Sequence, residues 1–319
     1  MATSAKTFDT GKYDFLGKAR YMIPVWTLIM LFCVFEIMYK GLDYGIDFSG
    51  GTEIQVQFQK PVSADDLRRL TSQLGYDEAG VQSFGEKNEY LIRLESVFGK
   101  DEKETNSLQK AMVSKITEGL QNHFKDNVVE LRRVDAVGPQ VGEELKRNSI
   151  LAAFYSLFMI LIYIGLRFDY KYAPGAVLCL LHDLIIMIGI FSIFDREVNV
   201  QTLAAILTLI GYSLNDTIIN FDRIRENEKL YPDQDFYGLV NRSVNDMLSR
   251  TILTVLTTEI AVGALYFLSD GVIQQIAFTL GIGIILGTFS SIYIASPLVI
   301  YADRLEQNRS RSRMRAAKV

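Results

Sequence analysis

The sequence lacks the motifs that mark most classes of enzyme. No phosphate loop, dinucleotide fingerprint, nucleophile elbow or cluster of metal-ligating residues occurs in its 319 residues. Its two cysteines, Cys33 and Cys179, lie in separate apolar runs without metal-ligand spacing, so we predict packing residues and not redox chemistry. The formal net charge of −4 is too small to indicate a nucleic-acid partner. Energy for work must therefore come from an ion gradient or from a partner's ATPase.

Apolar and charged residues are both abundant, but they are segregated along the chain. Apolar residues make up 49% and charged residues 22%, and the mean hydropathy is +0.15. This mixture is too hydrophobic for an ordinary soluble domain and too charged for a wholly embedded protein. Six apolar runs are long enough to cross a bilayer as helices. They cover residues 22–39, 150–166, 174–194, 198 to about 220, 252–268 and 272 to about 300.

The distribution of positive charge predicts how these runs are oriented. The first run has no small-residue cleavage site behind it, so we expect an uncleaved anchor. Lys and Arg gather in four segments on one side, whereas the two opposite turns hold only Arg196. The positive-inside rule then places both termini in the cytoplasm and the polar region outside, in a multi-pass protein of the cell inner membrane. The predicted parts are a cytoplasmic segment (1–20), a first span (21–40), a periplasmic domain (41–147), a five-span bundle (148–303) and a basic, disordered tail (304–319).

The polar region predicts an α+β domain of the ferredoxin-like type. Residues 52–58 alternate apolar and polar side chains, which indicates a strand, and Ser63 begins a helix that ends at Gly75. Two strands (81–84 and 89–94), a helix (104–124) and a last strand (128–134) follow, which completes a split β-α-β pattern. Glycine, serine and proline at both ends predict two joints. These joints contain Gly45, Ser49, Gly50, Gly51, Gly138 and Pro139.

The leading candidate for function is Asp216, which follows Asn215 near the inner end of the fourth run. A carboxylate at the centre of a spanning helix costs about 2.5–3.5 kcal/mol, so an intramembrane aspartate is a functional candidate by default. It could take up and release a proton. The alternative is an aspartate that reaches the membrane interface or forms a structural pair.

Other polar residues in the apolar runs offer weaker candidates. Arg250 begins the fifth run and could pair with Asp216, although an arginine there is commonly an interfacial anchor. His182 and Asp183 lie in mid-membrane, as a proton relay or as an interhelical hydrogen bond. Glu259 has no spacing that links it to the others. Gly283 and Gly287 form a GxxxG pattern, which predicts close helix packing.

Three stretches resemble the SecD/SecF family, and within it the SecF-type subunits. They are GLDYGIDFSGGTEIQVQF after the first run, LLHDLIIMIGIFSIF in the third and GYSLNDTIINFDRIREN in the fourth. The layout of six spans with one outer domain after the first is also similar. The resemblance implies a helical bundle of the RND superfamily with one ferredoxin-like outer domain.

The same resemblance implies the function and the site. It implies a non-enzymatic subunit that acts with SecD, the SecYEG translocon and YajC to promote preprotein export, driven by protons or, in some organisms, sodium. The family's motifs place the coupling residues at Asp216 and Arg250. This chain departs from the pattern at Asn220-Phe221 and at Glu259, which bears on the choice of ion. The alternatives are half of an RND exporter of small solutes and a passive scaffold of the translocon.

Overall fold

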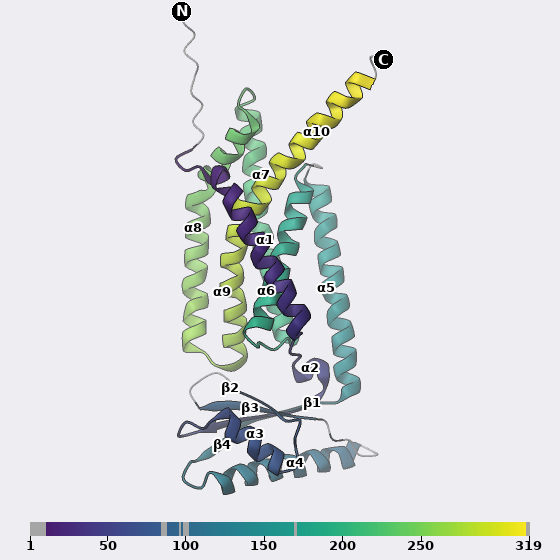
Figure 1. Ribbon diagram of the computed structural model, residues 1–319, viewed down its shortest axis with the longest axis vertical. Coiled ribbons are helices and arrows are strands. Elements are labelled where there is room, and N and C mark those ends of the chain that lie inside the picture. Colours follow the sequence, from purple (N-terminus) through teal and green to yellow (C-terminus); the bar gives the residue numbers. More distant parts are fainter. Residues whose placement is uncertain (1–10, 84–87, 96, 98–101, 169–170, 317–319) are drawn as a thin grey trace, which may run out of the picture.

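The protein consists of a long helical bundle that stands on a small sheet domain (Figure 1). This computed structural model describes residues 11–83, 88–95, 97, 102–168 and 171–316. The start of α1 and the end of α10 lie at the end of the bundle remote from the sheet domain (Figure 1). The fold class predicted from the sequence, six long apolar helices with one α+β domain after the first, is confirmed.

Six helices or continuous helical segments are long and apolar enough to cross a membrane. Two of them form the centre of the bundle, since half or more of the apolar window of α6 and of α7 is buried, against about a tenth or less in α1, α5 and α8. The sixth span runs without a break through α9, a π-helical turn and α10. The bounds are α1 Phe15–Lys40, α5 Pro139–Arg167, α6 Ala173–Ile193, α7 Val200–Leu230, α8 Phe236–Leu268, α9 Gly271–Ser290, η1 Ser291–Ala295 and α10 Ser296–Ala316.

The outer domain has the element order that the sequence predicts. Its four strands form one antiparallel sheet in the order β2-β3-β1-β4. A one-turn helix, α2 (Ile46–Ser49), precedes the sheet. The other elements are β1 (Gly51–Phe58), α3 (Ala64–Gln73), β2 (Gly80–Ser83), β3 (Glu89–Leu94), α4 (Glu102–His123) and β4 (Val129–Val137). The predicted turn at 85–88 lies largely outside the described residues.

Alternation along the strands gives the sheet two different faces. Ile54, Val56 and Phe58 point to one face and pack with Leu67 of α3 and Ile116 of α4 into an apolar core. The intervening residues point to the other face, which lies toward the bundle (Figure 1). That second face is polar, so the contact between domain and bundle is made by charges and hydrogen bonds.

Glycines set the close helix contacts in the bundle. A Cβ atom on Gly283 would lie 2.3 Å from the Leu209 side chain, and one on Gly287 would lie 2.9 Å from Ser213. The predicted GxxxG contact is therefore the packing of α9 against α7. Cys33 of α1 approaches Gly189 of α6 in the same way, which confirms its packing role.

The charged residues over 222–250 indicate a loop with an amphipathic piece at 236–248. Helix is present at 236–248, but the expected loop around it is wrong. α7 continues to Leu230 and α8 begins at Phe236, so only residues 231–235 connect them. Charged side chains pair across the helices there, as Arg223 with Asp246 at 2.7 Å. These pairs satisfy the polar faces, and the helices therefore extend beyond the apolar window.

The expectation of a disordered tail over 304–319 is also wrong for its described part, because α10 continues to Ala316. Arg, Gln, Glu and Ala favour helix, and no glycine or proline follows Pro297 to stop it. The pattern of residues 141–147 predicts a short amphipathic helix before the second span, but these residues are the first part of the continuous α5.

Candidate functional site

Asp216 lies inside the bundle on α7. This helix begins with a capping box in which Asn199 accepts from the Thr202 backbone and Thr202 accepts from the Asn199 backbone. Asp216 is 5% exposed, and its Oδ2 atom is buried without a hydrogen-bond partner among the described residues. An unpaired carboxylate oxygen in a buried site is costly, so this group is poised to gain a proton or a cation.

Arg250 of α8 supplies positive charge to Asp216 from the neighbouring helix. No ion pair within 4.0 Å joins the two residues in the described part of the chain, and Arg250 is exposed. The guanidinium therefore acts on the carboxylate electrostatically and not through a direct hydrogen bond. The charges of Asp216 and Arg250 therefore interact, although no direct ion pair joins the two side chains.

Asn215 points away from Asp216. It is exposed, because neighbouring residues on a helix are turned by about 100° from each other. It shares the outer face of α7 with three small or polar residues at helical spacing. These residues are Ala204, Thr208 and Gly211, all exposed.

His182 and Asp183 form a buried hydrogen-bonded cluster that joins three helices. Nδ1 of His182 lies 3.0 Å from one Asp183 oxygen. The other oxygen accepts from Ser213 Oγ of α7 at 2.6 Å and from Ser290 Oγ of α9 at 2.8 Å. Both Asp183 oxygens are satisfied, whereas Nε2 of His182 is buried without a hydrogen-bond partner among the described residues, so the geometry is compatible with both predicted readings. Ser213 lies three residues before Asp216, so the cluster is one turn away from it.

Sequence reasoning did not single out Ser213 or Ser290. A signal for Ser213 existed, since residues three apart share a helix face and Asp216 was already a candidate. Ser290 had none, because its contact depends on how α9 packs. Glu259 lies on α8 beside Gly281 of α9, and its Oε1 atom is buried without a partner in the structure as described.

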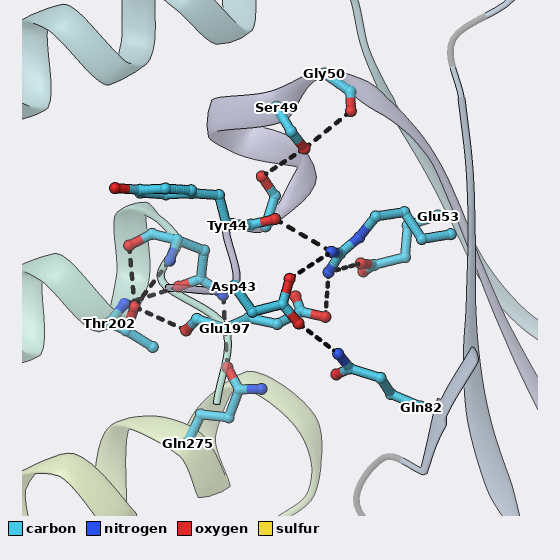
Figure 2. A network of polar contacts seen from close by, with 12 residues as sticks. Asp43, Tyr44, Ser49, Gly50, Glu53, Gln82, Glu197, Thr202 and Gln275 are labelled. Carbon is cyan, nitrogen blue, oxygen red and sulfur yellow. Dashed lines mark hydrogen bonds and ion pairs between the residues drawn. The ribbon is translucent and has the colours of Figure 1, made fainter. Parts of the chain in front are cut away.

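The two predicted joints meet at one neck. Gly50 and Gly51 have φ values of 70° and 133°, which favour glycine, and a Cβ on Gly50 would lie 3.0 Å from Pro139 Cα. Gly142 packs against Gly50 in turn. Ser49 Oγ donates to the carbonyl oxygens of Gly45 and Gly50, each at 3.1 Å (Figure 2). Gly138 caps the start of α5.

The segment that includes Gly45 is tied to the connection between α6 and α7. Gly45 N–H donates to Val198 O at 3.0 Å, and Val198 N–H donates to Asp43 O at 2.7 Å. A second tie runs from α2 to α7, since Asp47 Oδ2 accepts from Val200 N–H at 3.2 Å. The outer domain therefore contacts the first turn of the helix that carries Asp216.

A charged network, unpredicted from the sequence, fills the junction of domain and bundle. Arg93 of β3 binds Glu197, which lies before α7, and also bonds Asp43 Oδ1 at 3.3 Å and Tyr44 O at 3.1 Å. Glu53 of β1 lies 3.9 Å from the same guanidinium. Figure 2 shows the carboxylates of Asp43, Glu53 and Glu197 turned toward one centre.

Comparisons with known proteins identify the family. Residues 40–62 match the family model described as SecD/SecF GG Motif, and residues 116–305 match Protein export membrane protein SecD/SecF, C-terminal. The protein translocase subunit SecF of Magnetococcus marinus is 43% identical over 91% of this chain and 92% of that protein. The chain belongs to the SecD/SecF family. The SecF subunit of Pseudomonas aeruginosa is 37% identical over 92% of each chain.

Longer family members match with one part of their length. SecDF of Thermus thermophilus is 36% identical over 91% of this chain, which corresponds to 38% of that protein. Its crystal structure, described as a translocon-associated membrane protein, matches with a TM-score of 0.81 over 93% of this chain and 40% of that one, at 34% identity. SecDF in a super-membrane-facing form matches with a TM-score of 0.66 at 33% identity, over 95% of this chain and 40% of that one. The two solved structures therefore differ in how closely they match this chain in shape.

Proposed function

We propose that this chain acts as a SecF-like accessory subunit of the Sec protein translocase and promotes the passage of preproteins across the cytoplasmic membrane. Relatives named protein translocase subunit SecF match it over about nine tenths of both chains. The six apolar helices make it a multi-pass membrane protein. In this role it performs no covalent chemistry on the polypeptide. The distribution of Lys and Arg supports an orientation with both termini in the cytoplasm.

SecD is the proposed direct partner, since the Thermus relative combines the two in one SecDF chain. The exposed stripe of Ala204, Thr208, Gly211 and Asn215 on α7 supports this pairing, because small residues let helices pack closely in a membrane. The stripe runs along α7, the same helix that carries Asp216. SecYEG, YajC, the preprotein and the surrounding lipid complete the proposed set of partners.

Ion coupling at Asp216 is the proposed source of energy. Proton uptake would remove the negative charge that now faces Arg250 and would change the relative stability of two helix arrangements. The outer domain would move with α7, which it contacts through Asp47. Sodium remains the alternative ion, with Glu259 as the extra carboxylate near the bundle. This proposal rests mainly on one observation, namely that the Oδ2 atom of Asp216 is buried without a hydrogen-bond partner among the described residues.

The test is preprotein export in cells that carry Asp216→Asn, with membrane levels and SecD co-purification measured in parallel. We expect export to be largely lost while the protein accumulates and binds SecD normally, because Asn keeps the shape and removes the titratable charge. The matched control is Asp222→Asn on the same helix, since Asp222 is exposed and paired with Arg167. Normal export by Asp216→Asn would favour the passive scaffold and reject ion coupling at this residue.

A further inference from the structure

The junction between the outer domain and the bundle carries more negative than positive charge. Three carboxylates, those of Asp43, Glu53 and Glu197, surround the single guanidinium of Arg93. The Glu197 side chain is 6% exposed and the Glu53 side chain 17%, so water screens this imbalance poorly. Two carboxylates of like charge that share one buried cation cannot both remain fully ionised at neutral pH without cost.

Glu53 and Glu197 are the two carboxylates that share one nitrogen, Nη2 of Arg93. Burial, and next the charge of Glu197, raise the pKa of Glu53 to about 7, against the opposing charge of Arg93. Burial also raises the pKa of Glu197. Glu53 and Glu197 therefore lie beside the same guanidinium nitrogen, and their burial and like charge favour a proton on one of them.

Other charged groups that face Glu53 are engaged elsewhere or add to the same effect. Asp47 of α2 caps the backbone of Val200, and Asp135 of β4 pairs with Arg133 at 2.6 Å. Both carboxylates raise the pKa of Glu53 further. A cavity of about 520 Å³ lies at this junction, and it is lined by Glu53, Glu197 and, before α9, Asp270. The cavity is open enough for water, so protons reach the pair from the outer side.

We propose that Arg93, Glu53 and Glu197 form a proton-operated latch that holds the outer domain on the helical bundle. With a proton on the Glu53–Glu197 pair, Arg93 neutralises Glu197 and the contact is closed. Loss of that proton leaves three ionised carboxylates around one guanidinium, and their repulsion weakens the contact. The latch binds its proton on the outer side of the membrane and is distinct from Asp216 within the bundle.

Linkage sets the direction of the pH effect. Glu53 has a pKa of about 7 when docked and an ordinary value of 4.5 when free in water. The docked arrangement therefore binds the proton more tightly, so acid favours docking. Docking is strongest below about pH 4.5, weakens as the pH rises, and levels off above about pH 7. An outer side that is acidic thus keeps the domain seated.

The latch reaches the bundle through short covalent connections. Glu197 lies three residues before Val200, where α7 begins, and Asp43 lies three residues after Lys40, where α1 ends. Lys40 also pairs with Asp195 at 2.6 Å, which ties α1 to the same connection. Opening of the latch therefore removes the ion pair between β3 and the connection that leads into α7, while Gln82 of β2 keeps its hydrogen bond to Asp43 at 2.6 Å.

The experiment measures the distance between domain and bundle in the full chain, in lipid nanodiscs, at pH values from 5 to 8. Spin labels are placed on Gln121→Cys of α4 and Leu268→Cys at the end of α8, which are both exposed. Cys33 and Cys179 are buried and stay unlabelled. We expect the docked population to fall as the pH rises toward 7 and then to level off.

The variants separate the latch from a general effect of pH. Glu53→Gln mimics the protonated state, so most of the pH dependence should be lost with the domain docked. Arg93→Gln should shift the population toward the undocked state at neutral pH and recover docking in acid. The control Glu130→Gln alters an exposed carboxylate of β4 and should behave as the native chain.

A docked population that stays constant from pH 5 to 8 in the native chain would overturn the latch. So would an unchanged pH dependence in Glu53→Gln. Infrared spectroscopy gives an independent readout, since a protonated-carboxyl band present at pH 6 should disappear in Glu53→Gln. These readouts do not involve export, so the latch can fail or stand separately from ion coupling at Asp216.

Discussion

At the scale of single residues, the two buried aspartates of the bundle differ in what surrounds their oxygens. Asp183 accepts from Ser213 and Ser290 and contacts His182, so its charge is stabilised by three polar groups. Asp216 keeps an unpaired buried oxygen. A satisfied carboxylate holds a structure together, whereas an unsatisfied one can change its state at little structural cost.

We expect Ser213→Ala and Ser290→Ala each to lower the free energy of unfolding by about 0.6–1.7 kcal/mol, the range measured for interhelical hydrogen bonds in membranes. The double variant should be non-additive, because both hydroxyl groups donate to the same Asp183 oxygen. Unfolding in detergent mixtures measures this. Thr288→Ala is the control, since its hydroxyl bonds only its own helix. Strict additivity would show that the cluster does not act as a unit.

The sequence shows which residues are candidates for function more readily than it shows where their side chains point. The sequence pointed to Asp216 because a carboxylate in an apolar run is rare. It grouped Asn215 with it, although one step along a helix turns the side chain by about 100°, here from the buried face of α7 to its exposed face. Roles for Asp216, Arg250, Asp183 and His182 stay predictions, of which Asp216→Asn tests the first.

At the scale of elements, backbone contacts through glycine decide how the helices pack. Gly189 lets α6 approach α1 so closely that a Cβ there would lie 2.2 Å from Cys33 Cβ. Gly211 on α7 has no neighbouring atom within 4 Å. Of these two glycines, Gly189 is therefore required for close helix packing within this chain, whereas Gly211 is not.

Gly189→Ala should destabilise the chain by about 1–3 kcal/mol, because an added methyl in a filled contact forces the helices apart. Gly211→Ala should be neutral or slightly stabilising in the isolated chain, since alanine favours helix. The midpoint of unfolding in detergent compares the two. Equal effects would contradict the contact. Cys33→Gly should relieve Gly189→Ala only in part, because it removes the opposing Cβ and Sγ but leaves the Cys33 Cα, which would lie 2.9 Å from the added methyl.

Apolar runs located the spans, but they located the ends of the helices poorly. The charged residues after Asn220 and before Arg250 indicated a loop, yet Arg223 and Asp246 pair between two helices that continue into water. Such pairing depends on the distance between the two helices, and this distance cannot be predicted from the local sequence of either helix. The strands of the outer domain were predictable because alternation and turn residues are local.

At the scale of the whole molecule, the arrangement predicts which positions are reachable from each side of the membrane. Gln121→Cys on the outer domain should react in intact cells with a maleimide that cannot cross membranes. Gln307→Cys on α10 should react only after the membrane is permeabilised, because the positive-inside rule places the basic last part of α10 in the cytoplasm. The native cysteines are buried, so the unaltered chain gives a low background. Labelling of Gln307→Cys in intact cells would reverse the proposed orientation.

The junction network could not be predicted from the sequence. Arg93, Glu53 and Glu197 are separated by 40 and by more than a hundred positions, and each is an ordinary charged residue in its own segment. Glu53 and Arg93 are paired across β1 and β3, and neither this register nor the cover of this face by the bundle was predicted from the sequence. Only the packing of one part on the other creates the site.

The neck formed by Gly50, Pro139 and Gly142 has a consequence for how this architecture can vary. The polypeptide leaves the membrane part and returns to it at one point, so the outer domain is a modular insert with adjoining ends. Inserts of this kind can be exchanged or resized without altering the scaffold that carries them. Related chains can therefore diversify this domain while the helical bundle keeps one geometry.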